Sequence, residues 1–170
     1  IHNYQFDQQN ALFYCTNEKI NKDALKLAKT LVQNGINIYH QNQNNFSATH
    51  HAAITNSLSI LRYFIVKLDV DLNNVTNLPH PLNTCHYAKQ NLRILKFLID
   101  IKANINQPDG EGRTSLYYAI HDIHNKFYPN HQECLTTLIT AGAKILKPHY
   151  DQLLEDPQVT PQIKEILKQN

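Results

Sequence analysis

The chain has 170 residues, of which 42% are apolar and 18% charged, with 16 Lys and Arg against 14 Asp and Glu. So light and balanced a charge argues against a nucleic-acid partner, since phosphate binding needs a large, clustered basic excess. Its apolar runs are too short for membrane insertion, which takes about 20 residues, and its three cysteines are too few for a disulfide framework. We expect a cytoplasmic chain with a sizeable buried core.

Two sequence signatures recur along the chain. The first is an apolar–Asn/Asp–apolar pattern that follows Gly35, Asp69, Lys102 and Gly142. These four residues are spaced 34, 33 and 40 apart. The second signature precedes the first by 20 to 26 residues. The third residue of each copy is Leu12, Thr49, Leu82 or Leu116, and these are spaced 37, 33 and 34 apart. Recurrence at this period is typical of repeat proteins.

Between the two signatures, apolar residues follow a helical period. In chain order these are Leu25, Leu27, Ala28, Leu31 and Val32, then Leu58, Leu61, Ile65 and Leu68, then Ile94, Leu95, Leu98 and Ile99, then Leu135, Leu138 and Ile139. Small residues before them, such as Ala52, Cys85 and Ala119, indicate a short inner helix in each repeat. Asn21 or Asp23 is the expected N-cap of the first outer helix.

The expected outer helices end at the residues that open the first signature. Gly35 and Gly142 suit left-handed C-caps. Asp69 and Lys102 stand at the equivalent points, so those two caps should be more strained or differently built.

These residues resemble the ankyrin repeat, a unit of about 33 residues that carries T-P-L-H-x-A near its first helix. The fourth repeat matches best, over residues 109–116 and at Ala119, and the second keeps His50, whereas Phe13 and Asn83 stand where the histidine is expected. The resemblance implies an all-α solenoid of about four helix–turn–helix repeats with short hairpin fingers and a C-terminal capping helix. The repeats would span approximately 10–42, 43–75, 76–108 and 109–147.

The two ends should differ from the repeats. Residues 1–9 would form an N-terminal cap or the remnant of an upstream region, and the start at Ile1 without Met suggests a fragment or a processed product. Residues 148–170 would form the C-terminal cap, where Thr160 and Pro161 begin a helix.

Ankyrin proteins usually bind partners through finger tips and the concave face of the inner helices, so the resemblance implies a protein-binding surface here. Phe46 and Tyr87 are the expected aromatic anchors and Arg113 the main charged contact. By position the surface would comprise Gln43, Asn44, Phe46, Thr55, Thr76, Asn77, Tyr87, Glu111, Arg113, His121, Asp122, Phe127 and Tyr128. Two alternatives stay open: Phe46 could pack against a neighbouring finger, and the aromatics of the 124–131 insertion could cover the cap.

Metal and catalytic sites have weak sequence support. His121, His124, His131 and Cys134 form two pairs at helical spacing that a zinc ion could use, although Cys134 also suits a buried apolar position. We expect no cofactor and no enzyme activity within these residues, because all three cysteines stand at positions that a repeat would bury and the carboxylates are scattered.

The sequence therefore predicts a monomeric module that binds a protein of unidentified kind. Its degenerate repeats and composition resemble those of ankyrin effector proteins from intracellular bacteria, which would place it in a host cytosol and make a host protein the partner. The alternative is a targeting or regulatory segment of a larger enzyme whose catalytic domain lies outside this chain.

Overall fold

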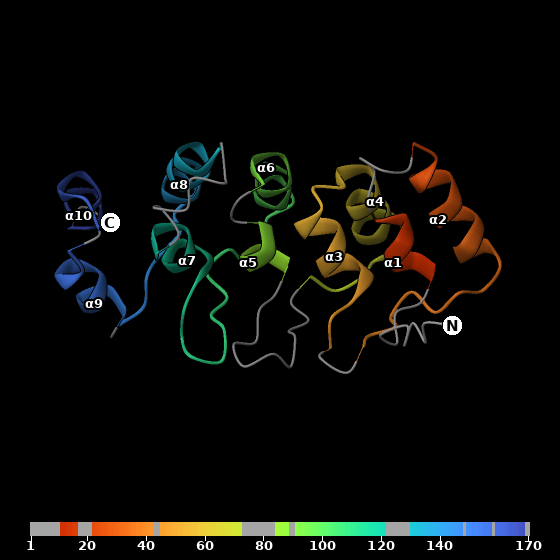
Figure 1. Ribbon diagram of the computed structural model, residues 1–170, viewed down its shortest axis with the longest axis horizontal. Coiled ribbons are helices and arrows are strands. Elements are labelled where there is room, and N and C mark those ends of the chain that lie inside the picture. The colour runs from red at the N-terminus through yellow and green to blue at the C-terminus, as the bar shows by residue number, and fades with distance from the viewer. Residues whose placement is uncertain are drawn as a thin grey trace, which may run out of the picture. The chain divides into compact units, whose positions relative to one another are not determined.

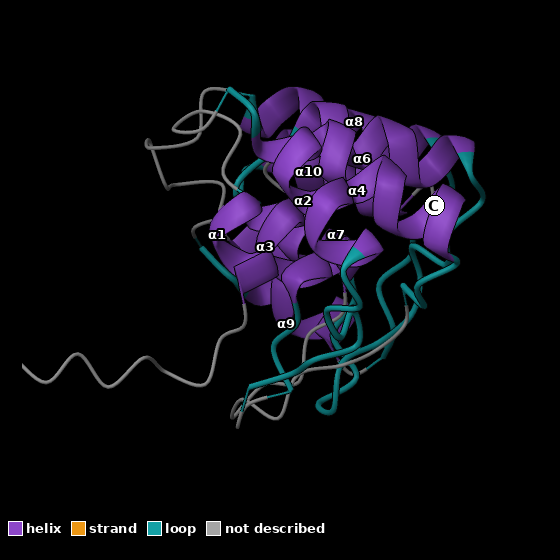
Figure 2. Cartoon of the chain, turned by 90° about the vertical axis from the view of Figure 1, so that its right-hand side faces the viewer, coloured by secondary structure: helices purple, strands orange, loops and turns teal. Residues whose placement is uncertain are grey.

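The computed structural model describes residues 11–16, 22–42, 45–72, 84–88, 91–121, 130–147, 149–157 and 159–168. These residues form helices joined by loops (Figures 1 and 2), with one isolated β-bridge between Gln41 and Ser47. They divide into two compact units, Ile1–Thr84 (unit 1) and Cys85–Asn170 (unit 2). The all-α expectation is confirmed.

Unit 1 contains two helix pairs. Its elements are α1 (Ala11–Cys15), α2 (Ala24–Gln33), α3 (Ala48–Ile54) and α4 (Leu58–Arg62), the last continued by a π-helical turn η1 (Tyr63–Lys67). The short inner helices α1 and α3 pack on the outer helices α2 and α4, while α1 also contacts α3 and α2 contacts α4. Leu12, Phe13, Ile60, Leu61 and Phe64 are almost completely buried between them. Each pair therefore completes its core by stacking on the other.

Unit 2 repeats the short-then-long helix pattern. Its elements are α5 (Thr84–Ala88), α6 (Leu92–Asp100), α7 (Ser115–His121), α8 (His131–Thr140), α9 (His149–Glu155) and α10 (Pro161–Lys168). The outer helices α6 and α8 lie against each other, and α7 packs on α8. The predicted C-terminal helix is confirmed: α10 starts at Pro161, and the Lys164 amide donates to the Thr160 carbonyl (3.0 Å).

The helix starts follow the sequence only in part. Ser47 caps α3 through a capping box in which the Ser47 amide donates to Nδ1 of His50 (3.1 Å). Asp23 is the N-cap residue of α2, as predicted, but its side chain makes no capping hydrogen bond.

Left-handed residues end all four outer helices. Gly35 and Gly142 have φ of +79°, and Asp69 and Lys102 adopt the same region at +54° and +59°. After Lys102 the Ala103 amide reaches back to the Leu98 carbonyl (2.9 Å), as in a Schellman cap. Asp69 instead follows the π-helical turn. Both caps strain a residue that has a Cβ, as expected from the missing glycines.

The third inner helix corrects the predicted register of its repeat. His86 is the third residue of α5, just as His50 is of α3, and it is buried with Nε2 3.0 Å from the Arg113 carbonyl oxygen. The sequence prediction that put Asn83 at the histidine position, after Leu82, was wrong by three residues. Cys85, a small buried residue, fills the place of the usual leucine, so the Pro81-Leu82 match was misleading. Leu82 and Asn83 themselves lie outside the described residues.

Candidate functional site

Ring-bearing side chains occupy the third and fourth positions of all four inner helices. The third positions hold Phe13, His50, His86 and Tyr117, and the fourth hold Tyr14, His51, Tyr87 and Tyr118. Among the residues at the fourth position, Tyr14 is exposed and the other three are half-buried. Each unit thus presents partly accessible rings beside its finger loop.

In unit 1 the finger is closed by an asparagine turn. The Asn42 amide donates to the Phe46 carbonyl (3.1 Å), and Oδ1 of Asn42 accepts from the Phe46 amide (3.0 Å). Asn45 takes the left-handed conformation that the turn requires, at φ +53°. The residues expected at the tip, Gln43 and Asn44, lie outside the described residues.

The predicted anchor Phe46 packs against the inner helices. Its ring stacks on His50, with centroids 5.6 Å apart and planes 25° apart, and lies 6.2 Å from both Phe13 and His51. The side chain is half-buried. Phe46 therefore contributes to packing against the inner helices of its own unit. The neighbouring finger of the alternative, at Thr76 and Asn77, lies outside the described residues.

On the inner helices of unit 1, two exposed apolar side chains were not predicted as contacts. Tyr14 on α1 is 56% exposed and Ile54 on α3 is 44% exposed, and these helices contact each other. Ile54 is the seventh residue of α3, which is the position that His121 has in α7. Comparing equivalent positions between repeats would have identified it, because His121 was already a candidate.

Thr55, a predicted contact residue, is used inside unit 1. Its hydroxyl donates to the carbonyl of His51 (2.8 Å) and lies close to the carbonyl of Thr16, which also accepts from Ser57. His51 Nδ1 bonds the Thr16 hydroxyl, and burial lowers the pKa of His51. This polar group ties the end of α1 to the end of α3.

In unit 2 the finger is closed by Asp109. Its Oδ1 accepts from the amides of Glu111 and Arg113 (both 2.8 Å), and its Oδ2 accepts from Arg113 Nε (3.0 Å) and the Tyr118 hydroxyl (2.6 Å). Gly112 supplies the left-handed residue at φ +79°. Burial alone would raise the pKa of Asp109, but these hydrogen bonds outweigh it and lower the pKa. The carboxylate is therefore a fixed structural anion.

Arg113, the predicted charged contact, is mostly buried, with 13% of its side chain exposed. It pairs with Asp109, and its Nη1 lies 2.8 Å from Oε2 of Glu111. Its guanidinium also lies over the rings of Tyr118 (5.2 Å) and Tyr117 (6.0 Å). Glu111, with 43% of its side chain exposed, is the more accessible charge of this finger.

Tyr117 connects the finger to the C-terminal cap. Its ring stacks on His121 (6.0 Å, 20°), and it lies 5.1 Å from His149 of α9. Nε2 of His149 donates to the Glu111 carbonyl (2.7 Å). Sequence reasoning missed His149 because it lies 38 residues from Glu111 in a segment assigned to the cap.

The other predicted contacts are only partly observed. Tyr87 is half-buried on α5 and His121 is exposed at the end of α7. Outside the described residues lie Thr76, Asn77, Asp122, Phe127 and Tyr128.

The chemistry of the cysteines favours structural roles. Burial raises the pKa of Cys134 to about 11, with Glu133 adding to the rise and Lys96 opposing it, and burial raises the pKa of Cys85 to about 12. Cys15 is buried too, and its pKa is raised. Protonated thiols are poor nucleophiles and poor metal ligands. Within the described ranges, His, Cys, Asp and Glu form no group of three that could hold a metal ion; His124 of the suggested zinc set lies outside them.

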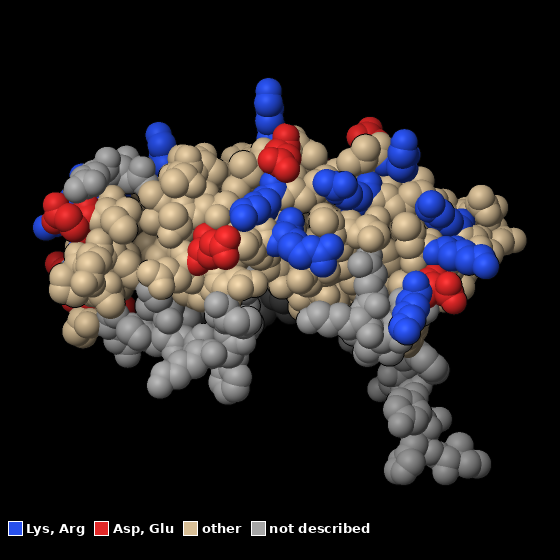
Figure 3. Space-filling view, turned by 90° about the horizontal axis from the view of Figure 1, so that it is seen from above, with Lys and Arg blue, Asp and Glu red and all other residues tan. Residues whose placement is uncertain are grey.

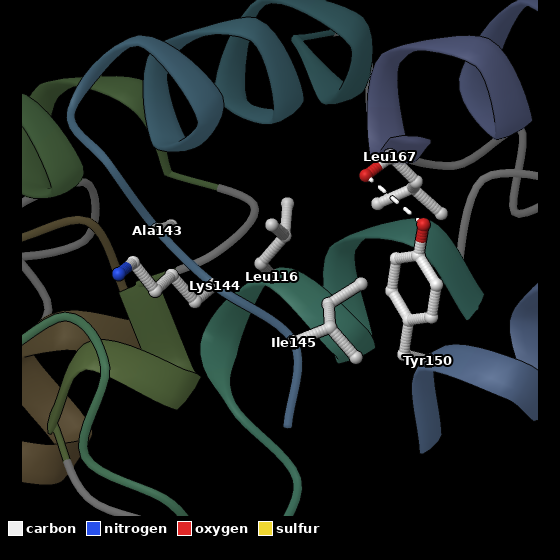
Figure 4. Close-up of a pocket in the computed structure, with 6 residues that line it drawn as sticks. All are labelled: Leu116, Ala143, Lys144, Ile145, Tyr150 and Leu167. Atoms are coloured by element: carbon white, nitrogen blue, oxygen red, sulfur yellow. Dashed lines mark hydrogen bonds between the residues drawn. The ribbon is translucent and has the colours of Figure 1, made fainter. Parts of the chain in front are cut away.

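A small cavity lies inside unit 2 between α7 and the cap helices (Figure 4). It has a volume of about 110 Å³, and the Tyr150 hydroxyl donates to the Leu167 carbonyl (3.3 Å) at its edge. Its lining is mainly apolar and consists of Leu116, Ala143, Lys144, Ile145, Tyr150 and Leu167. It holds no carboxylate or imidazole that would support acid–base chemistry.

A family model of ankyrin repeats (3 copies) matches residues 12–109, more than half of the chain. The chain belongs to the ankyrin repeat family. No curated protein matches it. Ankyrin repeats are generally protein–protein interaction modules and typically non-catalytic. In the part of this ankyrin chain that the structure describes, no helix has the length and apolar character needed to cross a membrane.

Proposed function

We propose that this ankyrin chain binds a partner protein through its finger loops and the exposed side of its inner helices. The observation that carries the proposal is the pair of ring positions in every inner helix, with Tyr14 the most exposed of these rings. In unit 1 the surface would centre on Tyr14 and Ile54. In unit 2 it would centre on Glu111, Tyr117 and His121.

Aromatic and aliphatic side chains on a rigid support suit protein recognition. Interface hot spots are enriched in large aromatic residues that lose little conformational freedom on binding. The fingers are held by the Asn42 and Asp109 turns, so little ordering cost remains when a partner binds. Phe46 and Arg113 support this surface from beneath rather than forming its contacts.

We also propose that four ankyrin repeats are present, one more than the family model matches. The pair α7 and α8 supports a fourth, because α7 packs on α8 and carries the two ring residues at its third and fourth positions. The roles as a bacterial effector or as part of a larger enzyme stay predictions.

The proposal is tested by affinity capture from eukaryotic cell lysate followed by mass spectrometry. The wild-type chain would be compared with Tyr14→Ser/Ile54→Ser in unit 1 and Glu111→Gln/His121→Ser in unit 2. Val66→Ser is the matched control, because Val66 is 59% exposed on η1, which continues the outer helix α4. Circular dichroism would confirm that each variant is folded.

A partner retained by the wild type and Val66→Ser but lost by either double variant supports the proposed surface. A partner retained by all variants places the binding site elsewhere. Reconstituting the captured complex from purified proteins would then show whether binding is direct.

A further inference from the structure

The outer helix α2 carries lysines along one side. Lys26 and Lys29 are three residues apart within α2, which places them on one face of the helix, and both are exposed. Lys22, also exposed, lies in the turn just before the helix. The neighbouring α4 and η1 add Arg62 and Lys67, and none of these three helical segments contains an acidic residue. Figure 3 looks onto the outer helices and shows blue Lys and Arg side chains over this part of unit 1.

An exposed leucine lies within this basic face. Leu27 was expected in the core with the apolar stripe of α2, but it is 41% exposed, because Ala24 and Ala28 are the residues that α2 buries. Leu27 lines a shallow hollow of about 320 Å³ together with Asp23, Lys26 and Thr30. The face therefore combines positive charge with an open recess whose apolar wall is Leu27 and whose lining also includes one carboxylate, that of Asp23.

Stability does not account for this arrangement. Like charges three residues apart on a helix repel, as Lys26 and Lys29 do, and Lys26 in the first turn of α2 opposes the helix dipole. In the described part of the chain, one of the three lysines makes a stabilising contact: Nζ of Lys29 lies 5.8 Å from the centre of the Tyr63 ring. No ion pair joins Lys22, Lys26 or Lys29 to a described carboxylate.

We propose that the lysine face of α2 binds an acidic segment of a partner protein that inserts one apolar side chain into the hollow beside Leu27. Charge complementarity selects carboxylates as the groups that contact the lysines. The recess selects a peptide over a membrane, because a side chain can fill it and a flat layer of headgroups cannot. This inference goes beyond the proposed function, since it concerns an outer helix and not the inner helices.

The binding should be weak and sensitive to salt. An exposed ion pair contributes about 0.2–1 kcal/mol and is screened at high ionic strength. Replacing two lysines should therefore weaken binding about two- to thirtyfold, and replacing Leu27 by Ser, which removes the apolar wall of the hollow, should weaken it further.

The experiment pans a random peptide display library against the full chain and measures the affinity of an enriched peptide by fluorescence anisotropy. The variants are Lys26→Gln/Lys29→Gln and Leu27→Ser. The matched control is Lys164→Gln/Lys168→Gln, which removes the same charge from the cap helix α10 of unit 2. Vesicles of phosphatidylserine in phosphatidylcholine are tested in parallel by co-sedimentation.

We expect enriched peptides to contain several Asp or Glu and a Leu, Ile or Phe, to bind less tightly to both α2 variants, and to bind the control as they bind the wild type. Enrichment of neutral or basic peptides, acidic peptides that bind all variants equally, or lysine-dependent binding to vesicles in place of peptides would each overturn the inference. None of these results bears on Tyr14, Ile54, Glu111 or His121, so the two proposals fail separately.

Discussion

Replacing Asp109 by Asn should destabilise unit 2 while leaving the shape of its finger intact. An asparagine at this position can still accept the amides of Glu111 and Arg113 through Oδ1, as Asn42 accepts the Phe46 amide in unit 1. The change removes the charge that pairs with Arg113 Nε and accepts the Tyr118 hydroxyl. The variant therefore isolates the charged half of the network.

The expected cost is about 2–3 kcal/mol in the free energy of unfolding. A hydrogen bond to a charged group contributes about 1.5–3 kcal/mol, and Arg113 keeps part of its compensation through Glu111. For a chain of this size the melting temperature should fall by about 4–12 °C, at about 2–4 °C per kcal/mol. Glu111→Gln is the control, since it removes an exposed acid from the same finger and should cost about 1 kcal/mol or less.

The loss should also depend on pH. The pKa of Asp109 is lower in the folded chain than its ordinary value, so the stability it provides is present above that ordinary value and is lost as the pH falls through the folded pKa. Urea unfolding followed by circular dichroism should show a gap between wild type and Asp109→Asn at neutral pH that narrows in acid. A variant within about 0.5 kcal/mol of wild type at neutral pH, or a gap that does not change in acid, would refute this reasoning.

Three further predictions concern backbone strain and burial. Lys102→Gly should raise the free energy of unfolding by about 0.5–1 kcal/mol. The left-handed φ of +59° strains a residue with a Cβ, and relief of this strain should exceed the entropy that the more flexible glycine loses on folding. A loss of stability on urea unfolding would contradict this. Ser115→Ala should be neutral or stabilising by up to about 1 kcal/mol, because the buried Ser115 hydroxyl has no hydrogen-bond partner among the described residues and the equivalent residue of α3 is Ala48; a melting temperature several degrees lower would count against it. The thiols should react with Ellman's reagent at pH 8 only after denaturation, because burial keeps them protonated and covered, and fast labelling of the native chain would disprove this for Cys15, Cys85 or Cys134.

Periodicity in the sequence predicted the features that depend only on neighbouring residues of the same helix. Ile94, Leu95 and Leu98, which α6 buries, and the start of α10 at Pro161 are set by local pattern and were predicted, whereas the buried Phe97 of α6 was not. The left-handed caps were predictable for the same reason, because Gly35 and Gly142 mark them directly.

The contacts of the candidate site depend on residues farther along the chain. Arg113 looks like an exposed charge in the sequence, but Asp109 and the Tyr118 ring hold it in place. Leu27 fits the apolar stripe of α2, yet Ala24 and Ala28 are the residues buried there. His149 reaches Glu111 from the C-terminal cap. No local pattern contains these contacts, so the sequence alone could not assign them.

In the two finger turns, the positions that hold the backbone are different from the tip positions, which can vary. In each turn the first residue, Asn42 or Asp109, holds the backbone, and the fourth, Asn45 or Gly112, supplies the left-handed conformation. Between Asp109 and Gly112, Glu111 donates its main-chain amide to Asp109, and its side chain, which pairs with Arg113, is 43% exposed. Substitutions at such tips can accumulate without loss of the fold, so partner specificity in this chain can evolve by exchanging tip residues while the helices stay unchanged.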